Sequence, residues 1–199
     1  MKAFRILVLV AGLALLHGCG AIPETEKLVY EPQTDVAPIQ GADGVTVNVD
    51  VVDDREDKSR ISSKKYSYGG FEMASIHSEE PVENVVQSAI EQELQARGFV
   101  VDADAPLTIH GDIEKLYSEL HLIDTFWTGK AVGDSQIDFV IGSKDGETLF
   151  SRVISVQPEY KGLMYQSGEN LARPVELAIE ETMDQLFADP AFIDALLNQ

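Results

Sequence analysis

Histidines and carboxylates are the side chains here that could hold a metal, but their spacing is not typical of a metal site. Beyond the N-terminal segment the histidines are widely separated, at His77, His110 and His121. A strand would present His110 and Asp112 on one face. Asp50 or Asp138 could complete a zinc site there, although a solvated polar strand face explains the same pattern. We therefore expect no metal and no cofactor.

The densest run of carboxylates directly follows residue 52. It comprises Asp53, Asp54, Glu56 and Asp57. A calcium loop needs six or more oxygen ligands, and this run lacks the regular alternation and the glycine of an EF-hand. The sequence contains neither a Gly-x-Ser-x-Gly nucleophile motif nor a phosphate-binding loop. We expect a protein that is not an enzyme, with a hydrolase whose active site is scattered along the chain as the remote alternative.

Cations and aromatic side chains gather in residues 58–71, the most distinctive stretch of the chain. They are Lys58, Arg60, Lys64, Lys65, Tyr66, Tyr68 and Phe71. In an acidic protein, such a loop could contact an anionic glycan, a lipid headgroup or an acidic partner. A flexible surface loop or an irregular hairpin without a binding role is the simpler explanation of the stretch, and both interpretations stay open.

Cys19, the only cysteine, closes an N-terminal segment with the order of a secretory signal. Lys2 and Arg5 precede an apolar stretch, residues 6–16, that is too short to span a bilayer as a stable helix. A single cysteine excludes an intramolecular disulfide. The sequence Leu-Leu-His-Gly-Cys at 15–19 resembles the lipobox of bacterial lipoproteins, with His17 where Ala, Ser or Thr is usual.

The lipobox resemblance implies a processed and acylated protein. Residues 1–18 would be the signal peptide, cut before Cys19, and the cysteine thiol and the new amine would both be acylated. Two or three acyl chains make a firm membrane anchor. In enterobacterial lipoproteins an Asp after the cysteine favours the inner membrane. Gly20 therefore implies the outer membrane, with the protein facing the periplasm.

The chain is strongly acidic, with a net charge of −19 from 34 acidic and 15 basic residues. This charge excludes general electrostatic binding to nucleic acid and repels anionic lipid surfaces. Residues 19–44 contain three prolines and little hydrophobic periodicity, which predicts a lipidated, extended tether. Leu28, Val29 and Tyr30 in that segment could instead pack on the domain. Residues 45–199 are expected to form a single domain.

Hydrophobic periodicity predicts the elements of this domain. Alternation with period two predicts strands near 45–52, 107–114, 136–141 and 149–156, with a bulge at Lys115-Leu116 and a hairpin turn at Asp145-Gly146. Period 3.6 predicts two main helices and a short last helix from Pro190. The first helix would be capped by Ser78 or Glu80 and would end at Arg97-Gly98.

These elements predict the α+β fold class: two layers, with a mostly antiparallel sheet and both main helices packed on one face. The other sheet face would carry polar side chains, and we expect it to be wet or used for binding. Its predicted residues are Asn48, Asp50, His110, Asp112, Glu114, Gln136 and Asp138.

Two short segments carry a resemblance to a known family: Asp53-Asp54-Arg55 after the first strand and Ala96-Arg97-Gly98-Phe99 after the first helix. With the lipobox, they resemble the YajG-type lipoproteins of Gram-negative bacteria over most of the chain. The resemblance implies an outer-membrane lipoprotein with no known catalysis. The element order is also similar to the TolB N-terminal domain and the lipopolysaccharide-assembly lipoprotein LptE, a fold-level likeness that assigns no function.

The leading hypothesis is a non-enzymatic periplasmic module, held on the outer membrane by lipid on Cys19, that binds a protein partner in envelope assembly or transport. The alternative is a ligand-binding lipoprotein that contacts lipopolysaccharide, lipid or peptidoglycan through residues 58–71.

Overall fold

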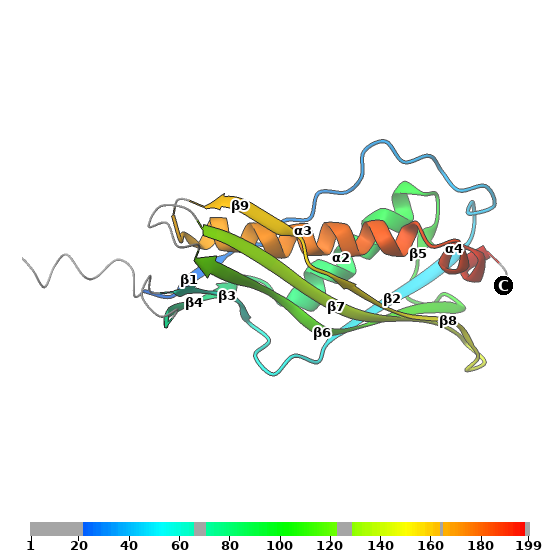
Figure 1. Cartoon of the computed structure of the whole chain (residues 1–199). Helices are drawn as coiled ribbons and strands as arrows, with labels where there is room; N and C mark the ends of the chain where they lie inside the picture. The colour runs from blue at the N-terminus through cyan, green and yellow to red at the C-terminus, as the bar shows by residue number, and fades with distance from the viewer. Residues whose placement is uncertain (1–21, 66–70, 123–128, 164, 198–199) are drawn as a thin grey trace, which may run out of the picture.

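The structure, a computed structural model, describes residues 22–65, 71–122, 129–163 and 165–197. The elements in chain order are β1 (Glu24–Glu26), β2 (Thr46–Asp53), β3 (Arg60–Lys65), β4 (Glu72–Ser78), α2 (Val82–Ala96), β5 (Val100–Val101), β6 (Leu107–Leu122), β7 (Gly129–Ser143), β8 (Thr148–Val156), β9 (Glu159–Leu163), α3 (Gly168–Phe187) and α4 (Pro190–Leu197). The strands form one sheet, and the two main helices pack on the same face of it (Figure 1). The predicted α+β class is therefore confirmed.

β6 and β7 are the long strands that organise the sheet. They pair antiparallel along their whole length, with Ile109 opposite Ile141. In β7, buried and half-exposed residues alternate almost without interruption, because successive side chains of a strand point to opposite faces. The register shifts between Ile113 and Lys115, which confirms the predicted bulge.

Shorter strands flank this pair. Each long strand pairs along its outer edge with two of them, one near each of its ends. β2 lies beside residues 107–113 of β6, and β3 meets β6 at Ser118. β8 pairs with residues 135–142 of β7, and β9 with residues 129–132. The sheet is mixed: the extensive β6–β7 and β7–β8 pairings are antiparallel as predicted, whereas β2 runs parallel to β5 and β6. The parallel arrangement arises because α2 crosses over between β2 and its neighbours.

The two main helices each bury one apolar stripe against the sheet, as their periodicity predicts. α2 packs on β2 and β5, and α3 packs on β6, β7 and β8. The N-cap of α2 is Pro81 without a side-chain hydrogen bond, so the predicted caps Ser78 and Glu80 are wrong. Gly98, with φ at 95°, ends this helix as predicted. Of the helices described, none is long and apolar enough to cross a membrane.

Strand β7 and helix α3 approach each other most closely at Gly133 and Pro174. A Cβ atom placed on Gly133 would lie 2.1 Å from the carbonyl oxygen of Pro174 and 3.2 Å from the Cβ of Ala178. Only glycine therefore allows the helix backbone to rest on the strand here.

The described part of the predicted tether, residues 22–44, packs along the domain. β1 extends the sheet beside β4, and Leu28 and Ala42 are buried in the core. The backbone N–H of Ile39 donates to the carbonyl oxygen of Arg97 at 2.9 Å. The segment crosses the helical layer between β1 and β2 (Figure 1). Over these residues the chain is thus part of the folded unit, the alternative that Leu28 and Tyr30 had left open.

Candidate functional site

The cations predicted as part of a binding loop fall largely on a hairpin. β3 and β4 pair antiparallel, with Lys65 opposite Glu72. Lys58 precedes β3 and is exposed. Tyr66 and Tyr68 lie outside the described residues, as does Cys19. Of the predicted set, the structure brings Arg60, Lys64 and Lys65 together on one strand.

Three of these four cations contact carboxylates of the same fold. The pairs are Lys64 with Glu24, Lys65 with Glu119 and Arg60 with Glu72. The hydrogen bond from Lys64 lowers the pKa of Glu24, and the hydrogen bond from Lys65 lowers the pKa of Glu119. The contacts of Lys64 and Lys65 hold the hairpin to β1 and β6, and the contact of Arg60 joins its two strands. Much of the positive charge of this stretch is therefore compensated within the protein.

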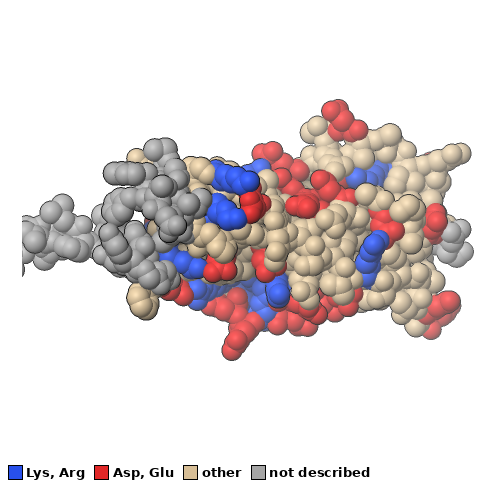
Figure 2. All heavy atoms as spheres, viewed as in Figure 1, with Lys and Arg blue, Asp and Glu red and all other residues tan. Residues whose placement is uncertain are grey.

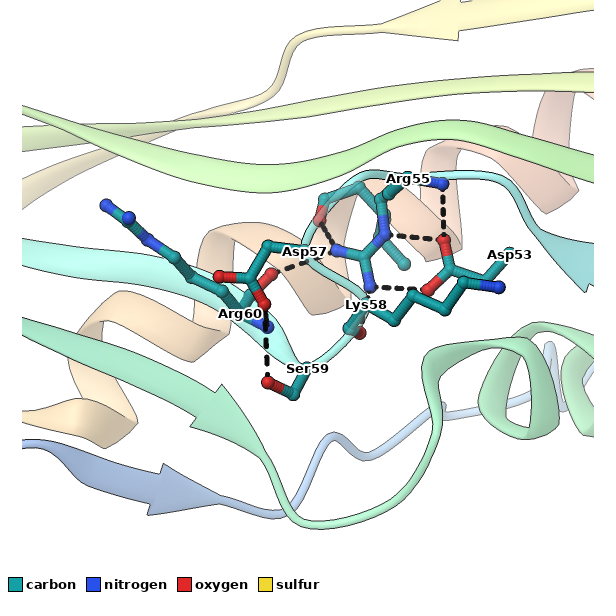
Figure 3. Close-up of polar contacts among 7 residues, drawn as sticks. Asp53, Arg55, Asp57, Lys58, Ser59 and Arg60 are labelled. Atoms are coloured by element: carbon teal, nitrogen blue, oxygen red, sulfur yellow. Dashed lines mark hydrogen bonds and ion pairs between the residues drawn. The ribbon is translucent and has the colours of Figure 1, made fainter.

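The loop between β2 and β3 is closed by a buried ion pair (Figure 3). The side chain of Asp53 is fully buried, and its oxygens accept from Nε and Nη2 of Arg55 at 2.8 and 2.9 Å. Nη1 of Arg55 donates to the carbonyl oxygens of Leu116 at 2.6 Å and Arg60 at 3.0 Å, and Nη2 donates to that of Lys58. All donors of the guanidinium group are thus used to fasten the loop to β6, so this pair is structural.

A second buried pair, Glu93 with Arg97, lies at the C-terminal end of α2. The Tyr30 hydroxyl donates to Glu93 at 2.5 Å, and the Gln33 backbone N–H donates to it at 3.0 Å. The guanidinium of Arg97 lies 4.4 Å from the ring centroid of Phe187. Sequence reasoning missed this cluster, although an acid on the apolar stripe of a helix is a signal that could have identified it.

The sheet face away from the helices is polar, as the alternation predicts. One row across it consists of Val52, Asp112, Asp138 and Val153, on β2, β6, β7 and β8. In the next row, Asp50 Oδ2 lies 3.3 Å from His110 Nδ1. Figure 2 shows acidic side chains along the lower edge of the molecule, below the strands. We call this surface the open sheet face.

Negative charge on the open sheet face is not fully compensated. Partial burial raises the pKa of Asp112, and the nearby carboxylates of Asp54 and Asp138 raise it further, while His110 opposes the shift. Within the described residues, Oδ1 of Asp138 is buried and has no hydrogen-bond partner. A cation placed over this row would relieve the repulsion.

A hollow of about 370 Å³ adjoins the open sheet face. It lies near the point along β6 where the neighbouring strand changes from β2 to β3. Arg60, Leu116 and Tyr117 are among the residues that line it. Within the described part of the chain, no group of three or more His, Cys, Asp or Glu side chains is placed to hold a metal ion. The open sheet face and the adjoining hollow together offer charged and apolar surface for contact with another molecule.

Comparison with known proteins extends the likeness along almost the whole chain. The uncharacterized lipoprotein YajG of Escherichia coli K12 is 20% identical over 188 residues, which cover 93% of this chain and 92% of the relative. A crystallised protein from Xanthomonas campestris shares the fold with a TM-score of 0.55 at 12% identity, over 81% of this chain and 91% of that one. A Helicobacter pylori protein, named as a homolog of a neuraminyllactose-binding hemagglutinin, gives a TM-score of 0.50 at 9% identity, over 86% and 97%.

The family model described as "Uncharacterized lipoprotein" matches residues 32–196. This span contains both buried ion pairs, around Arg55 and Arg97, and all of the open sheet face. The match covers well over half of the sequence, and the relative from Escherichia coli matches over a similar length. The chain therefore belongs to the YajG family of lipoproteins.

Proposed function

We propose that this protein is a non-enzymatic lipoprotein, anchored in the outer membrane by lipid on Cys19, that binds a basic partner protein of the envelope through the open sheet face. The observation that carries the proposal is the row from Val52 to Val153, in which two carboxylates lie between two exposed valines. The leader, with Cys19 after a charged and apolar segment, supports the anchor.

The charge of the open sheet face defines the chemistry of the partner. Partial burial raises the pKa of Asp112, and repulsion from the carboxylates of Asp54 and Asp138 raises it further. A Lys or Arg side chain from a partner, placed over Asp112 and Asp138, would replace the repulsion with attraction. Complementary charge of this kind raises association rates and excludes acidic partners.

Exposed apolar side chains supply the rest of the contact. Val52 is 43% exposed and Val153 is 52% exposed, one on each side of the acidic pair. Interfaces commonly combine such apolar contacts with polar groups at their margins. The alternative, anionic ligand binding through residues 58–71, is less well supported, because Arg60, Lys64 and Lys65 already contact carboxylates.

Photo-crosslinking in living cells tests this proposal. We expect a crosslinker at Val153 to give an adduct of defined mass, and a crosslinker at Val100, a similarly exposed valine on β5, to give none. Asp112→Lys should reduce the Val153 adduct severalfold, because it reverses the charge that attracts the partner. Asp145→Lys, on the exposed turn between β7 and β8, is the charge-matched control and should leave the adduct unchanged. An adduct that survives Asp112→Lys at full yield would overturn the proposal.

A further inference from the structure

One end of the domain presents an unusual concentration of exposed hydrophobic side chains. Here lie the end of β3, the start of β4, the end of β9 and the start of α3, opposite the C-terminal helix α4 (Figure 1). The exposed side chains are Ile22 at 58%, Phe71 at 73%, Met73 at 37% and Tyr165 at 73%. We call these four residues the apolar end. A surface patch of this kind marks an interaction site.

Strand pairing and a hydrogen bond hold the strands and loops of the apolar end together. Lys65, the last residue of β3, lies opposite Glu72, which is flanked by Phe71 and Met73. The backbone N–H of Lys65 donates to Oε1 of Gln166 at 2.7 Å, which brings the segment after β9, with its Tyr165, to the same place. Side chains from two distant parts of the chain thus share one surface.

The N-terminal segment joins the folded unit at this end. Glu24 pairs with Lys64, and its second oxygen accepts from the backbone N–H of Gly168 at 2.5 Å. The contact fixes β1 between the hairpin and the first turn of α3. Ile22 lies two residues before this anchor point. The chain towards Cys19 therefore leaves from the apolar end.

The length of free chain before Glu24 limits how far the domain can stand from its lipid. Five residue steps separate Cys19 from Glu24. Fully extended, they span at most about 17 Å, because each residue contributes at most about 3.5 Å. The residues between β1 and β2, predicted from composition to be a long tether, pack along the domain instead, so Glu24 stays within this distance of Cys19.

We infer that the apolar end rests on the phospholipid surface of the membrane that holds the lipid anchor. This inference depends on the proposed lipidation of Cys19. Contact with the acyl boundary would remove Ile22, Phe71 and Met73 from water, and Tyr165 suits the headgroup region, where its ring and hydroxyl meet different environments. The short chain to Cys19 allows this end, and no other, to lie against the bilayer.

Charge at this end supports the same orientation. In Figure 2, Lys and Arg side chains gather on the half of the visible face nearer to this end. Lys130 and Lys161 lie opposite each other on β7 and β9, and both contact Glu159. Lys161 is largely exposed, with 75% of its side chain accessible. The two lysines share a single carboxylate, so this group keeps a net positive charge that attracts lipid phosphates, whereas the acidic protein as a whole is repelled by them.

The inference can be tested by placing single spin labels on the lipidated chain in vesicles of phosphatidylethanolamine and phosphatidylglycerol. Cys19 is the only native cysteine and its thiol would be acylated, so an introduced cysteine is the one free thiol. Phe71→Cys and Tyr165→Cys probe the apolar end, and Val100→Cys is the matched exposed control. The measured quantity is the ratio of the label's collision rate with oxygen to its collision rate with a water-soluble nickel complex. We expect binding to vesicles to raise this ratio severalfold for the labels at 71 and 165. The ratio for the label at 100 should stay unchanged.

The outcomes separate the inference from the proposed anchor. If the chain floats with the vesicles but labels at 71 and 165 stay as open to water as the label at 100, the inference is wrong and the anchor stands. If the chain does not float, both fail. The same labels on a Cys19→Ala chain without vesicles should be open to water. Shielding at 71 in that chain would show that a second copy covers the apolar end, which would also overturn the inference.

Discussion

At the scale of single residues, the two segments that carry the family resemblance have structural tasks. Arg55 binds Asp53 and three carbonyl groups, and so fixes the loop between β2 and β3. Arg97 ends α2, pairs with Glu93 and stacks on Phe187. Both arginines are nearly buried, so neither is available to a ligand. Both arginines therefore stabilise the fold of this chain, and binding residues must be sought elsewhere.

Replacing Arg55 with lysine should destabilise the protein strongly. A lysine keeps the charge but cannot bridge both oxygens of Asp53 while donating to three carbonyl groups. We expect the free energy of unfolding to fall by about 3 kcal/mol, the scale of breaking a buried ion pair. Urea denaturation followed by circular dichroism measures the change. Lys58→Ala, at an exposed side chain in the same loop, should cost no more than about 0.5 kcal/mol, and an equal loss in the two variants would contradict the assignment.

Acid should weaken the cluster around Glu93. Burial opposes the ionised form, but hydrogen bonds from Tyr30, Gln33 and Arg97 outweigh it and hold the pKa of Glu93 below its ordinary value of 4.5. A lowered pKa stabilises the fold above the unfolded pKa, and this contribution is lost as the pH falls through the folded pKa. The free energy of unfolding should therefore drop below about pH 4.5.

The variant Glu93→Gln isolates this contribution. It should be less stable than the native protein at pH 7 and should lose less of its stability between pH 7 and pH 3, because the titrating carboxylate is absent. Urea denaturation across this pH range measures both effects. Glu147→Gln, at the exposed β7–β8 turn, should keep the native pH dependence. A native pH dependence in Glu93→Gln would show that the cluster does not contribute.

At the scale of elements, β7 is the strand on which the other parts converge. It pairs with β6, β8 and β9, and its Gly133 lies directly under the backbone of α3. Pro174 lacks an N–H group and so weakens the helix at this turn. The close approach at Gly133 allows the helix to lie flat on the sheet despite that interruption. Helix and strand thus constrain each other at a single glycine.

Gly133→Ala should disrupt this contact. The new methyl group would lie 2.1 Å from the carbonyl oxygen of Pro174, so the helix backbone must move away from the sheet. We expect a loss of about 3 kcal/mol or more in the free energy of unfolding, the upper range for overpacking. Gly142→Ala is the matched control in the same strand, since nothing lies within 4 Å of its Cβ position. Thermal denaturation that shows the same midpoint for both variants would contradict this account.

The elements that can be predicted from the sequence are those marked by a local pattern of residues. The faces of α2 and α3, the bulge after Ile113 and the turn at Gly146 all follow from periodicity or turn chemistry. The parallel pairing of β2 with β6 leaves no such pattern, because it depends on partners about 60 residues apart. Docking of residues 22–44 depends on Tyr30 and Gln33 meeting Glu93, and long-range polar contacts of this kind are not encoded in composition. The open sheet face is predictable as polar, while its uncompensated row emerges only from the strand register.

At the scale of the whole molecule, three surfaces have separate tasks. The N-terminal segment and the helices close one side of the sheet. In the arrangement that we propose, the open sheet face offers carboxylates and valines to a basic partner, and the apolar end faces the lipid. This division would let an acidic protein lie close to a membrane, because most of its negative charge would point away from the phosphates. Orientation would then follow from the short chain between Cys19 and Glu24.

Everything in this arrangement depends on the lipid at Cys19, and metabolic labelling with a palmitate analogue tests it most directly. The native protein should carry the label and should fractionate with the outer membrane. The Cys19→Ala protein should carry no label and should leave that fraction, because the remaining contacts at the apolar end are too few to hold it without acyl chains. Equal labelling of the two proteins, or equal retention in the outer membrane, would contradict the account.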